Sequence, residues 1–490
     1  MRTQRCLLLM LIVTASARAG AQSPPAREAA SFAAELDHLL GVPEGLTADA
    51  AAAQALATSF ELEGRRDAVD AAENQVTQAA VGYLPRVGIA ARALWLSAIT
   101  PPLFGPLVIA PDSPEGPVLP GAVLVNTPAS FAALRHQIAA EISLVLPISD
   151  YLLRIVQAHS AARHSAAGAS FALRAARRQV ATAGRLAFYG WVRARLQVVI
   201  ADAAVAQAKA HLADVARLRE VGRVPPADAL RVDAQLAAAE QLRARALEAR
   251  AVQFQQLQTL LHAPDMQEPE IGEDVRAALP PLRESLDSDR WVDRAIDQRP
   301  ELQALAAATA SLVEQATTLR AGIYPRLDAV ASATTANPNP RFFPPQDRYD
   351  TTWALGLQLG WSPTDALASG AGRSSLEAQA RKAAVDEKQA RDALRNEVVT
   401  AIEALRAADV AVESSARGLI SAEESYRQRR ELYRNGRATS VELTDAETAL
   451  TQARLDAIDA FIDRRVARAR LLQAAGEPVE GPLNAQEGKP

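Results

Sequence analysis

The sequence predicts a mainly α-helical protein with a small β part, built as two tandem repeats. Alanine dominates its 49% hydrophobic content and aromatic residues make up only 4% of the 490 residues, which is typical of long helices rather than of globular cores. A long charged helix, a glycine turn and a second helix occur twice, at Gly222 and at Gly436. Four short segments alternate apolar with small or polar residues, which is the period of a β-strand.

The N-terminus has the features of a secretory signal peptide, which we place at residues 1–21. Arg2 and Arg5 precede the apolar run CLLLMLIV, and ASARAGAQ supplies the small residues that signal cleavage requires. The only cysteine, Cys6, lies inside this segment, and no cysteine stands at the cleavage point to carry a lipid anchor. We therefore expect an exported chain without disulfide or thiol chemistry.

Two segments carry the clearest strand pattern. In WALGLQLGW, within a strand predicted at about 350–362, Trp353, Leu357 and Trp361 belong to an apolar face that alternates with small and polar residues. IAAEISLVL, within a strand predicted at about 134–148, alternates in the same way. Such alternation with aromatic residues at its ends indicates a membrane-spanning β-strand. No run of 18 apolar residues follows the signal peptide, so no transmembrane helix is expected.

Two further strands are predicted at about 84–98 and 324–336. Each follows a helix that ends in a Gly-x-x-Pro sequence, GYLP in the first case and GIYP in the second. The segments at about 99–133 and 337–349 are expected to be surface loops between the strands, because their proline density excludes helix.

The order helix, strand, loop, strand, long helix, turn, helix thus occurs twice. The predicted segments are a first repeat at 22–265, a linker at 266–290 with short structure at most, a second repeat at 291–475 and a flexible tail at 476–490. Each repeat ends in a long helical hairpin, at about 151–261 in the first and about 364–474 in the second. Helical solenoid repeats have periods of about 20 to 50 residues, which excludes that architecture.

The predicted helices are too long for a globular domain. Those at 151–220 and 364–434 would each extend about 105 Å. The helices that follow the two turns are about half as long, and so are the helices at 46–82 and 291–321 that precede the strands. One helix from each shorter class, stacked end to end, would match a long helix.

Four strands cannot close a β-barrel by themselves. Unpaired backbone groups at a sheet edge are not tolerated in lipid, so we expect several copies of the chain to share one barrel. Barrels with an even number of strands from eight upward are usual. Two copies would suffice and three would give 12 strands, and the residues alone leave both open.

These features together resemble the TolC-like outer-membrane efflux family. The resemblance rests on the duplicated plan, on GYLPRV and GIYPRL before the strands, on WSPTDALASGAGR after the last strand and on the paired glycine turns. It implies a homotrimer with a 12-stranded β-barrel in the lipid of the bacterial outer membrane, continuous with an α-helical tunnel in the periplasm. It also implies an outer-membrane channel that passes substrates from an inner-membrane pump and a periplasmic adaptor protein to the exterior.

The resemblance also implies roles for residues at the two turns, which would lie at the periplasmic tip of the tunnel. The turn residues that would contact the adaptor are Gly222, Arg223, Gly436 and Arg437. A closed-state latch would join Tyr433 to Asp228, with Arg437 next to Ala438, where the family has an arginine. Whether Arg437 replaces that arginine is left open. The pore constriction would be lined by Glu442 and Asp445.

Each of these residues also has a plain structural interpretation. The sequence TSVE is a capping box with Thr439 and Glu442, so helix capping alone explains Glu442. Asp445 lies beyond the first turn, and a solvated surface position would also explain it. Asp228 stands at a helix start, where acidic residues are common, and Tyr433 could pack between helices.

Other functions are disfavoured. The net charge of −4 and the scattered basic residues predict no binding of nucleic acid. His159 and His164 lie on different helix faces, and no nucleophile motif, phosphate loop or metal spacing occurs, so we expect no enzyme, cofactor or metal. The alternative is a periplasmic structural or adaptor coiled-coil protein without a pore, which would have no use for Trp-bounded alternating strands.

Overall fold

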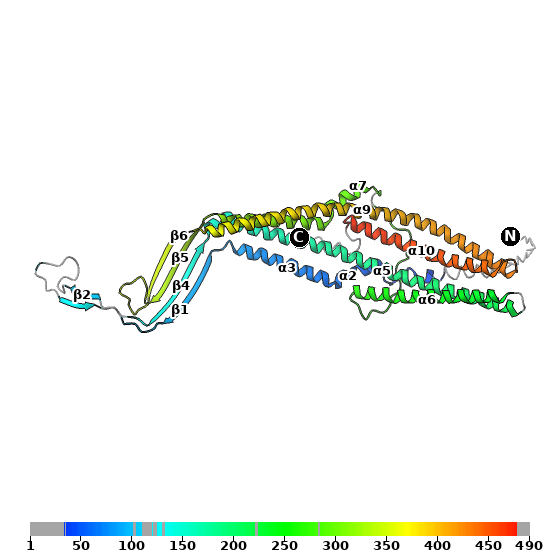
Figure 1. Ribbon diagram of the computed structural model, residues 1–490, viewed down its shortest axis with the longest axis horizontal. Helices are drawn as coiled ribbons and strands as arrows, with labels where there is room; N and C mark the ends of the chain where they lie inside the picture. The colour runs from blue at the N-terminus through cyan, green and yellow to red at the C-terminus, as the bar shows by residue number, and fades with distance from the viewer. Residues whose placement is uncertain are drawn as a thin grey trace, which may run out of the picture. The chain divides into compact units, whose positions relative to one another are not determined.

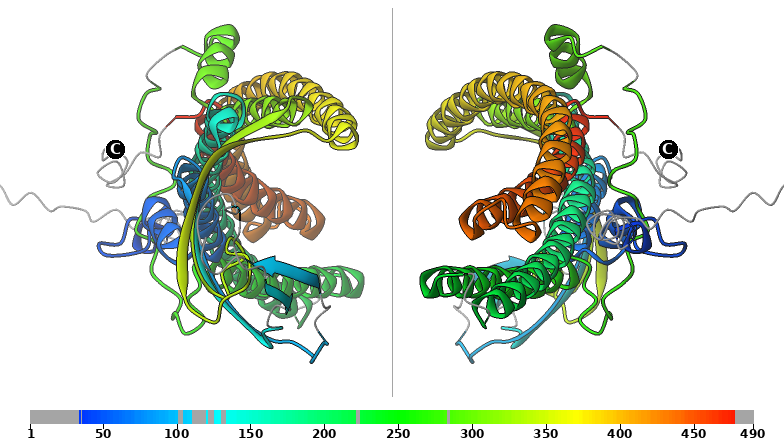
Figure 2. Two further views of the ribbon diagram at one scale, coloured as in Figure 1. Left: turned by 90° about the vertical axis from the view of Figure 1, so that its left-hand side faces the viewer. Right: turned by 90° about the vertical axis from the view of Figure 1, so that its right-hand side faces the viewer.

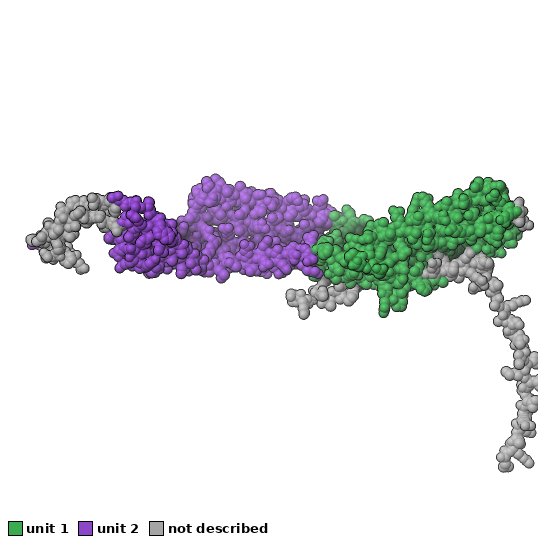
Figure 3. Space-filling view, turned by 90° about the horizontal axis from the view of Figure 1, so that it is seen from below, with its two compact units in different colours: residues 1–62, 176–298, 393–490 green, residues 63–175, 299–392 purple. Residues whose placement is uncertain are grey.

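The structure, a computed structural model, describes residues 34–477 apart from residue 35 and the ranges 101–103, 110–119, 121–124, 130–132, 221–223 and 283–284. The described chain forms two compact units (Figure 3). Unit 1 comprises residues 1–62, 176–298 and 393–490, and unit 2 comprises residues 63–175 and 299–392. Each unit contains segments of both predicted repeats, so neither compact unit corresponds to one repeat.

Unit 2 contains a four-stranded antiparallel sheet (Figure 1). Its strands, in spatial order, are β1 (Arg86–Trp95), β4 (His136–Leu146), β5 (Arg326–Asn337) and β6 (Asp350–Gly360). β4 and β5 come from different halves of the sequence and pair from Leu146↔Ala329 to Ile138↔Asn337. The two halves are therefore joined in one sheet by backbone hydrogen bonds. Among the described residues, the outer sides of β1 and β6 have no partner strand.

A separate two-stranded hairpin lies within the segment predicted as a loop at 99–133. It consists of β2 (Phe104–Ile109) and β3 (Val125–Ala129). The segment was predicted as a surface loop, and the hairpin within it was not predicted. Prolines exclude a helix, but they are tolerated in short edge strands and at bulges. The pairing indeed shifts register between Phe104 and Pro106, and Pro106 stands opposite Pro128.

Helices make up most of the described chain, as predicted. The longest are α5 (Val156–Glu220), α6 (Pro226–Leu260), α9 (Pro363–Arg434) and α10 (Ser440–Ala474). α5 is preceded by α4 (Ile148–Asp150) and by the π-helical turn η1 (Tyr151–Ile155), where a regular α-helix was predicted. No helix within the described ranges is long and apolar enough to cross a membrane.

The helices before the strands are each interrupted once, which differs from the continuous helices predicted at 46–82 and 291–321. α2 (Ala48–Thr58) and α3 (Phe60–Val81) are separated by Ser59, whose ψ is 118°. α7 (Ser288–Gln298) and α8 (Pro300–Arg320) are separated by Arg299, whose ψ is 117°. The second break follows from Pro300, because a residue before proline is excluded from the α region and proline favours the first helical position. α8 continues into η2 (Ala321–Ile323), just before β5.

The linker predicted at 266–290 is held firmly inside unit 1. A parallel bridge joins Ile271 to Leu46, and the backbones of Gly45 and Gly272 approach so closely that a Cβ on Gly272 would lie 2.2 Å from the Gly45 carbonyl oxygen. The indole Nε1 of Trp191 donates to Glu268 at 3.0 Å. Only glycine allows the close approach of the Gly45 and Gly272 backbones. The described part of the linker is therefore packed into the unit.

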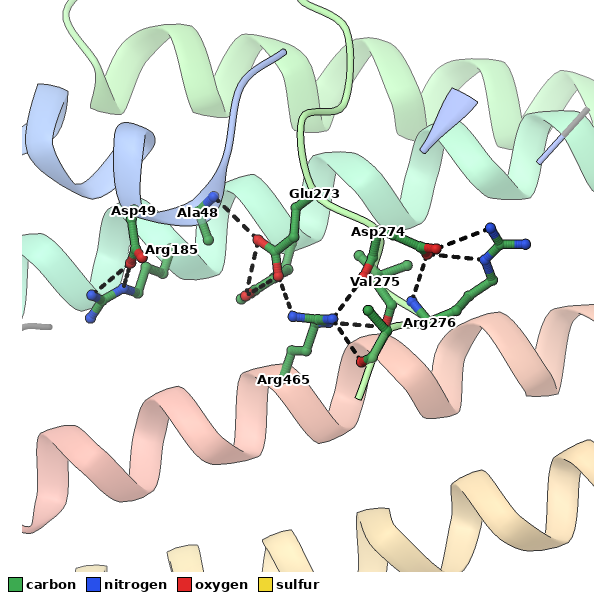
Figure 4. A network of polar contacts seen from close by, with 10 residues as sticks. Ala48, Asp49, Arg185, Glu273, Asp274, Val275, Arg276 and Arg465 are labelled. Atoms are coloured by element: carbon green, nitrogen blue, oxygen red, sulfur yellow. Dashed lines mark hydrogen bonds and ion pairs between the residues drawn. The ribbon is translucent and has the colours of Figure 1, made fainter. Parts of the chain in front are cut away.

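Arg465 of α10 is the main anchor of the linker (Figure 4). Its side chain is buried and pairs with the carboxylate of Glu273, which also accepts from the Tyr189 hydroxyl at 3.1 Å. Burial raises the pKa of Tyr189, so the phenol stays protonated as a donor. The Arg465 guanidinium also donates to the backbone carbonyls of Val275, Asp274 and Ala277. One side chain thus satisfies four acceptors of the linker.

We predict that Arg465→Met destabilises unit 1, because it leaves a partly buried carboxylate and three carbonyls without their donor. Removing one partner of a buried ion pair costs about 3 to 5 kcal/mol. Arg470→Met on the exposed side of the same helix is the matched control and should change stability by less than about 0.5 kcal/mol. Thermal unfolding and amide hydrogen exchange of the linker report the difference. Equal effects of the two substitutions would contradict the anchoring role.

Candidate functional site

One face of the unit 2 sheet is apolar and exposed. Cross-strand pairs on this face include Leu327↔Leu359 and Ala331↔Leu355 between β5 and β6, and Ile89↔Ile142 between β1 and β4. Large side chains here are exposed in the protomer, such as Leu357 at 71%. An apolar face that extends over four strands is much larger than the isolated exposed residues of ordinary surfaces. This face therefore requires an apolar environment.

The opposite face of the sheet carries polar and small residues. Its pairs include Ser143↔Ser332 between β4 and β5 and Asp328↔Gln358 between β5 and β6. Gly88 faces Ser143, and a Cβ on Gly88 would lie 2.7 Å from its hydroxyl oxygen. The two faces thus differ in the way that separates a lipid face from a water-filled interior.

Aromatic residues bracket the apolar face. Trp353 lies near the start of β6, and Trp361 follows the end of β6. Trp95 is the last residue of β1, so it lies at the same end of the strands as Trp353. The eight residue steps from Trp353 to Trp361 correspond to about 27 Å along the strand. This matches the apolar band of a transmembrane β-barrel with its aromatic girdles.

The second turn of unit 1 follows from local capping chemistry. α9 ends in a Schellman motif in which the Arg437 amide donates to Leu432 at 2.8 Å and the Gly436 amide donates to Tyr433 at 2.9 Å. Gly436 has a φ of +68°, which a residue with a side chain adopts only with strain. α10 then begins at the capping box of Thr439 and Glu442, and both of its hydrogen bonds are present.

The ends of both hairpins contribute side chains to one hydrophobic cluster. Figure 2 shows the long helices of the hairpins end-on. We call the cluster the tip cluster; its buried members are Val215, Val232, Tyr426, Tyr433, Leu443, Ala446 and Leu450. They come from α5, α6, α9 and α10, so the structure brings the two repeated turns together. Gly222 and Arg223 of the first turn lie outside the described residues. Asp228 stands half-buried in the first turn of α6, where its charge is favourable to the helix dipole.

The two carboxylates predicted at the constriction differ in their surroundings. Glu442 is held by the Thr439 amide at 2.8 Å and by Arg429 of α9 at 2.6 Å. Hydrogen bonding from the Thr439 backbone, with the nearby Arg429 charge, lowers the pKa of Glu442, so it stays ionised. Asp445 is exposed, one helical turn further on, and it has no ion pair within the described part of the chain. Only Asp445 therefore presents an uncompensated charge.

The residues predicted as a latch are not joined in the protomer. The ring of Tyr433 is buried in the tip cluster, but its hydroxyl makes no hydrogen bond with Asp228. Burial raises the pKa of Tyr433, and Asp214 and Asp228 raise it further. Arg437 is exposed and has no ion pair among the described residues. The protomer thus favours packing as the role of Tyr433, and the latch stays a prediction.

The sequence analysis missed a buried polar bridge beside Tyr433. His211 of α5 lies between Glu447 and Ser440 of α10, with Nδ1 3.1 Å from the Glu447 carboxylate and Nε2 3.3 Å from the Ser440 hydroxyl. A signal for it exists in the helix pattern. His211 falls between Ala208 and Val215, which are buried, and Glu447 falls between buried apolar positions of α10. Polar residues at such core positions are typical of a register-setting contact.

Comparisons with known proteins agree with this architecture. Residues 291–477 match the outer membrane efflux protein family. No curated protein is significantly similar in sequence. Among solved structures, CusC has a TM-score of 0.70 at 16% identity, over 90% of this chain and 97% of that chain. The Campylobacter jejuni CmeC outer membrane channel has a TM-score of 0.72 at 14% identity, over 91% and 92%.

A third structure extends the set to a channel described as open. The Neisseria gonorrhoeae MtrE outer membrane channel, solved in its open state, has a TM-score of 0.69 at 16% identity, over 88% of this chain and 89% of that chain. The resemblance drawn from the sequence is confirmed. The chain has the fold of these outer-membrane channels, and its residues 291–477 match the outer membrane efflux protein family.

Proposed function

We propose that the protein is the outer-membrane channel of a tripartite efflux or secretion system. It would act as the exit duct that receives substrates from an inner-membrane pump through a periplasmic adaptor. The observation that carries this proposal is the sheet of unit 2, which has one exposed apolar face and two edges that no other described strand pairs with. The family match and the shared fold support the same function. A periplasmic coiled-coil protein would gain nothing from such a sheet.

We further propose that three copies share one barrel. Four strands from each copy give 12, an even number in the usual range of outer-membrane barrels. In this assembly β1 of one copy pairs with β6 of the next, so that no edge meets lipid. The protein would be located in the bacterial outer membrane, with its helices in the periplasm.

The tip of unit 1 is the proposed gate. Gly436 and Arg437 would contact the adaptor together with Gly222 and Arg223, and the latch residues Tyr433 and Asp228 would act at the same place. Glu442 and Asp445 would line the constriction. Since Glu442 is already paired with Arg429, the proposed selectivity resides mainly in Asp445.

The first experiment tests insertion of the sheet. We predict that Leu357→Arg, which places a charge in the middle of the apolar face, prevents assembly in the outer membrane, because a basic residue facing lipid at mid-depth costs about 2 to 4 kcal/mol per copy. Gln358→Arg is the matched control on the opposite face, beside Asp328. Heat-stable oligomers in outer-membrane extracts are the measurement. Normal assembly of Leu357→Arg would argue that this face does not contact lipid.

The second experiment tests the constriction. Three copies of Asp445 form a carboxylate ring, and such rings make a pore favour cations. We predict that Asp445→Asn reduces cation selectivity, measured as the reversal potential across a salt gradient in planar bilayers, without lowering thermal stability. Glu442→Gln should change selectivity less, because Arg429 already offsets that charge. If Asp445→Asn channels keep wild-type selectivity, Asp445 is a solvated surface residue.

A further inference from the structure

We infer that the bridge from His211 to Glu447 and Ser440 is the internal latch that holds the tip closed in this chain. The inference rests on the proposed function as a channel gated at this tip. It assigns a role to three residues that lie outside the predicted latch and constriction. The bridge joins α5, which comes from the first half of the sequence, to α10, which comes from the second.

The geometry of the bridge is complete on both sides of the imidazole. The His211 Nδ1 is 3.1 Å from Glu447 Oε2, and Nε2 is 3.3 Å from the Ser440 Oγ. With Nδ1 as the donor to the carboxylate, Nε2 accepts from the Ser440 hydroxyl, so a neutral histidine satisfies both partners. The Tyr433 ring of α9 packs edge-on against the imidazole, with 5.3 Å between ring centroids. Side chains of three helices therefore fix the position of one ring.

Burial distinguishes this bridge from the other polar links at the tip. The side chains of His211 and Glu447 are 1% and 7% exposed, whereas those of Arg429 and Glu442 are 43% and 42% exposed. Exposed pairs contribute little and are screened by salt. A buried carboxylate that loses its only partner keeps the full penalty of desolvation. Among the polar links at the tip, the His211 bridge is therefore the one that most opposes separation of α10 from α5.

The position of Ser440 relates the bridge to the turn. Ser440 is the first residue of α10, directly after the N-cap Thr439, so its bond to His211 fixes the start of α10 against α5. Glu447 lies two turns further along the same helix. Next to it, Thr448 accepts from Gln235 of α6 at 3.0 Å, which adds an exposed link between the hairpins. A movement that widens the tip by shifting the second hairpin from the first must break these contacts.

The test compares single-channel conductance in planar bilayers for the full-length oligomer and its variants. His211→Phe keeps a ring in the tip cluster but removes both bonds, and Glu447→Met removes the acceptor of the Nδ1 bond while it keeps an unbranched side chain of similar length. We expect each to raise the mean conductance, or the fraction of time spent open, at least twofold. Glu248→Gln, at an exposed position of α6 away from the turn, is the control and should keep the wild-type conductance. Tyr433→Phe is measured beside it to distinguish the His211 bridge from the latch proposed at the Tyr433 hydroxyl.

The outcomes separate the latch from the channel itself. A wild-type oligomer that forms no conducting pores would overturn the proposed function. If the wild type conducts and both bridge variants conduct identically to it, the latch is overturned and the bridge serves only stability. If Tyr433→Phe alone opens the channel, the gate is held by the Tyr433 hydroxyl instead. Should His211→Phe fail to assemble, Glu447→Met, which keeps the imidazole but removes its acceptor, decides the question.

Discussion

The free edges of the four-stranded sheet are the constraint on which the rest of the structure depends. Within the part of the chain that the structure describes, β1 and β6 each leave one side of their backbone without a partner strand, and the large side chains on one face of the sheet are exposed. Neither feature is stable in the protomer alone, because lipid cannot satisfy the edges and water disfavours the apolar face. Copies of the chain that complete one barrel satisfy both requirements. Because β4 pairs with β5, each copy would contribute four adjacent strands, two from each half of its sequence.

The helices of unit 1 are held in place by a different kind of contact. The core of this unit is poor in aromatic residues, and much of the packing is by alanine, which permits close approach but gives little directional specificity. Buried polar contacts supply that specificity: Arg465 holds the linker, and His211 aligns α5 with α10. These contacts restrict register more than they add stability. Alanine-rich helices with a few buried polar contacts suit the proposed function, in which the helices hold one arrangement and yet move at the tip.

Much of this architecture is predictable from local patterns. The alternation in WALGLQLGW predicts β6 and its apolar face, and TSVE predicts the capping box that begins α10. The features that escaped prediction depend on contacts between distant segments. Nothing near Glu273 in the sequence points to Arg465, and His211 and Glu447 are 236 positions apart. The breaks at Ser59 and Arg299 escaped for another reason, since helical periodicity continues on both sides of each break. Pro300 was the available signal for the second.

The central claim is that each sheet edge is completed by another copy of the chain. Cysteine cross-linking tests it directly, because Cys6 is the only native cysteine. Within one protomer, β1 and β6 are separated by β4 and β5, about 14 Å across three strand spacings, which no disulfide can span. Ala91→Cys in β1 would be combined in turn with Leu355→Cys or Leu357→Cys in β6, all on the apolar face. The account predicts covalent oligomers of up to three chains after oxidation in membranes. Exclusively monomeric chains for every combination along β6 would contradict it.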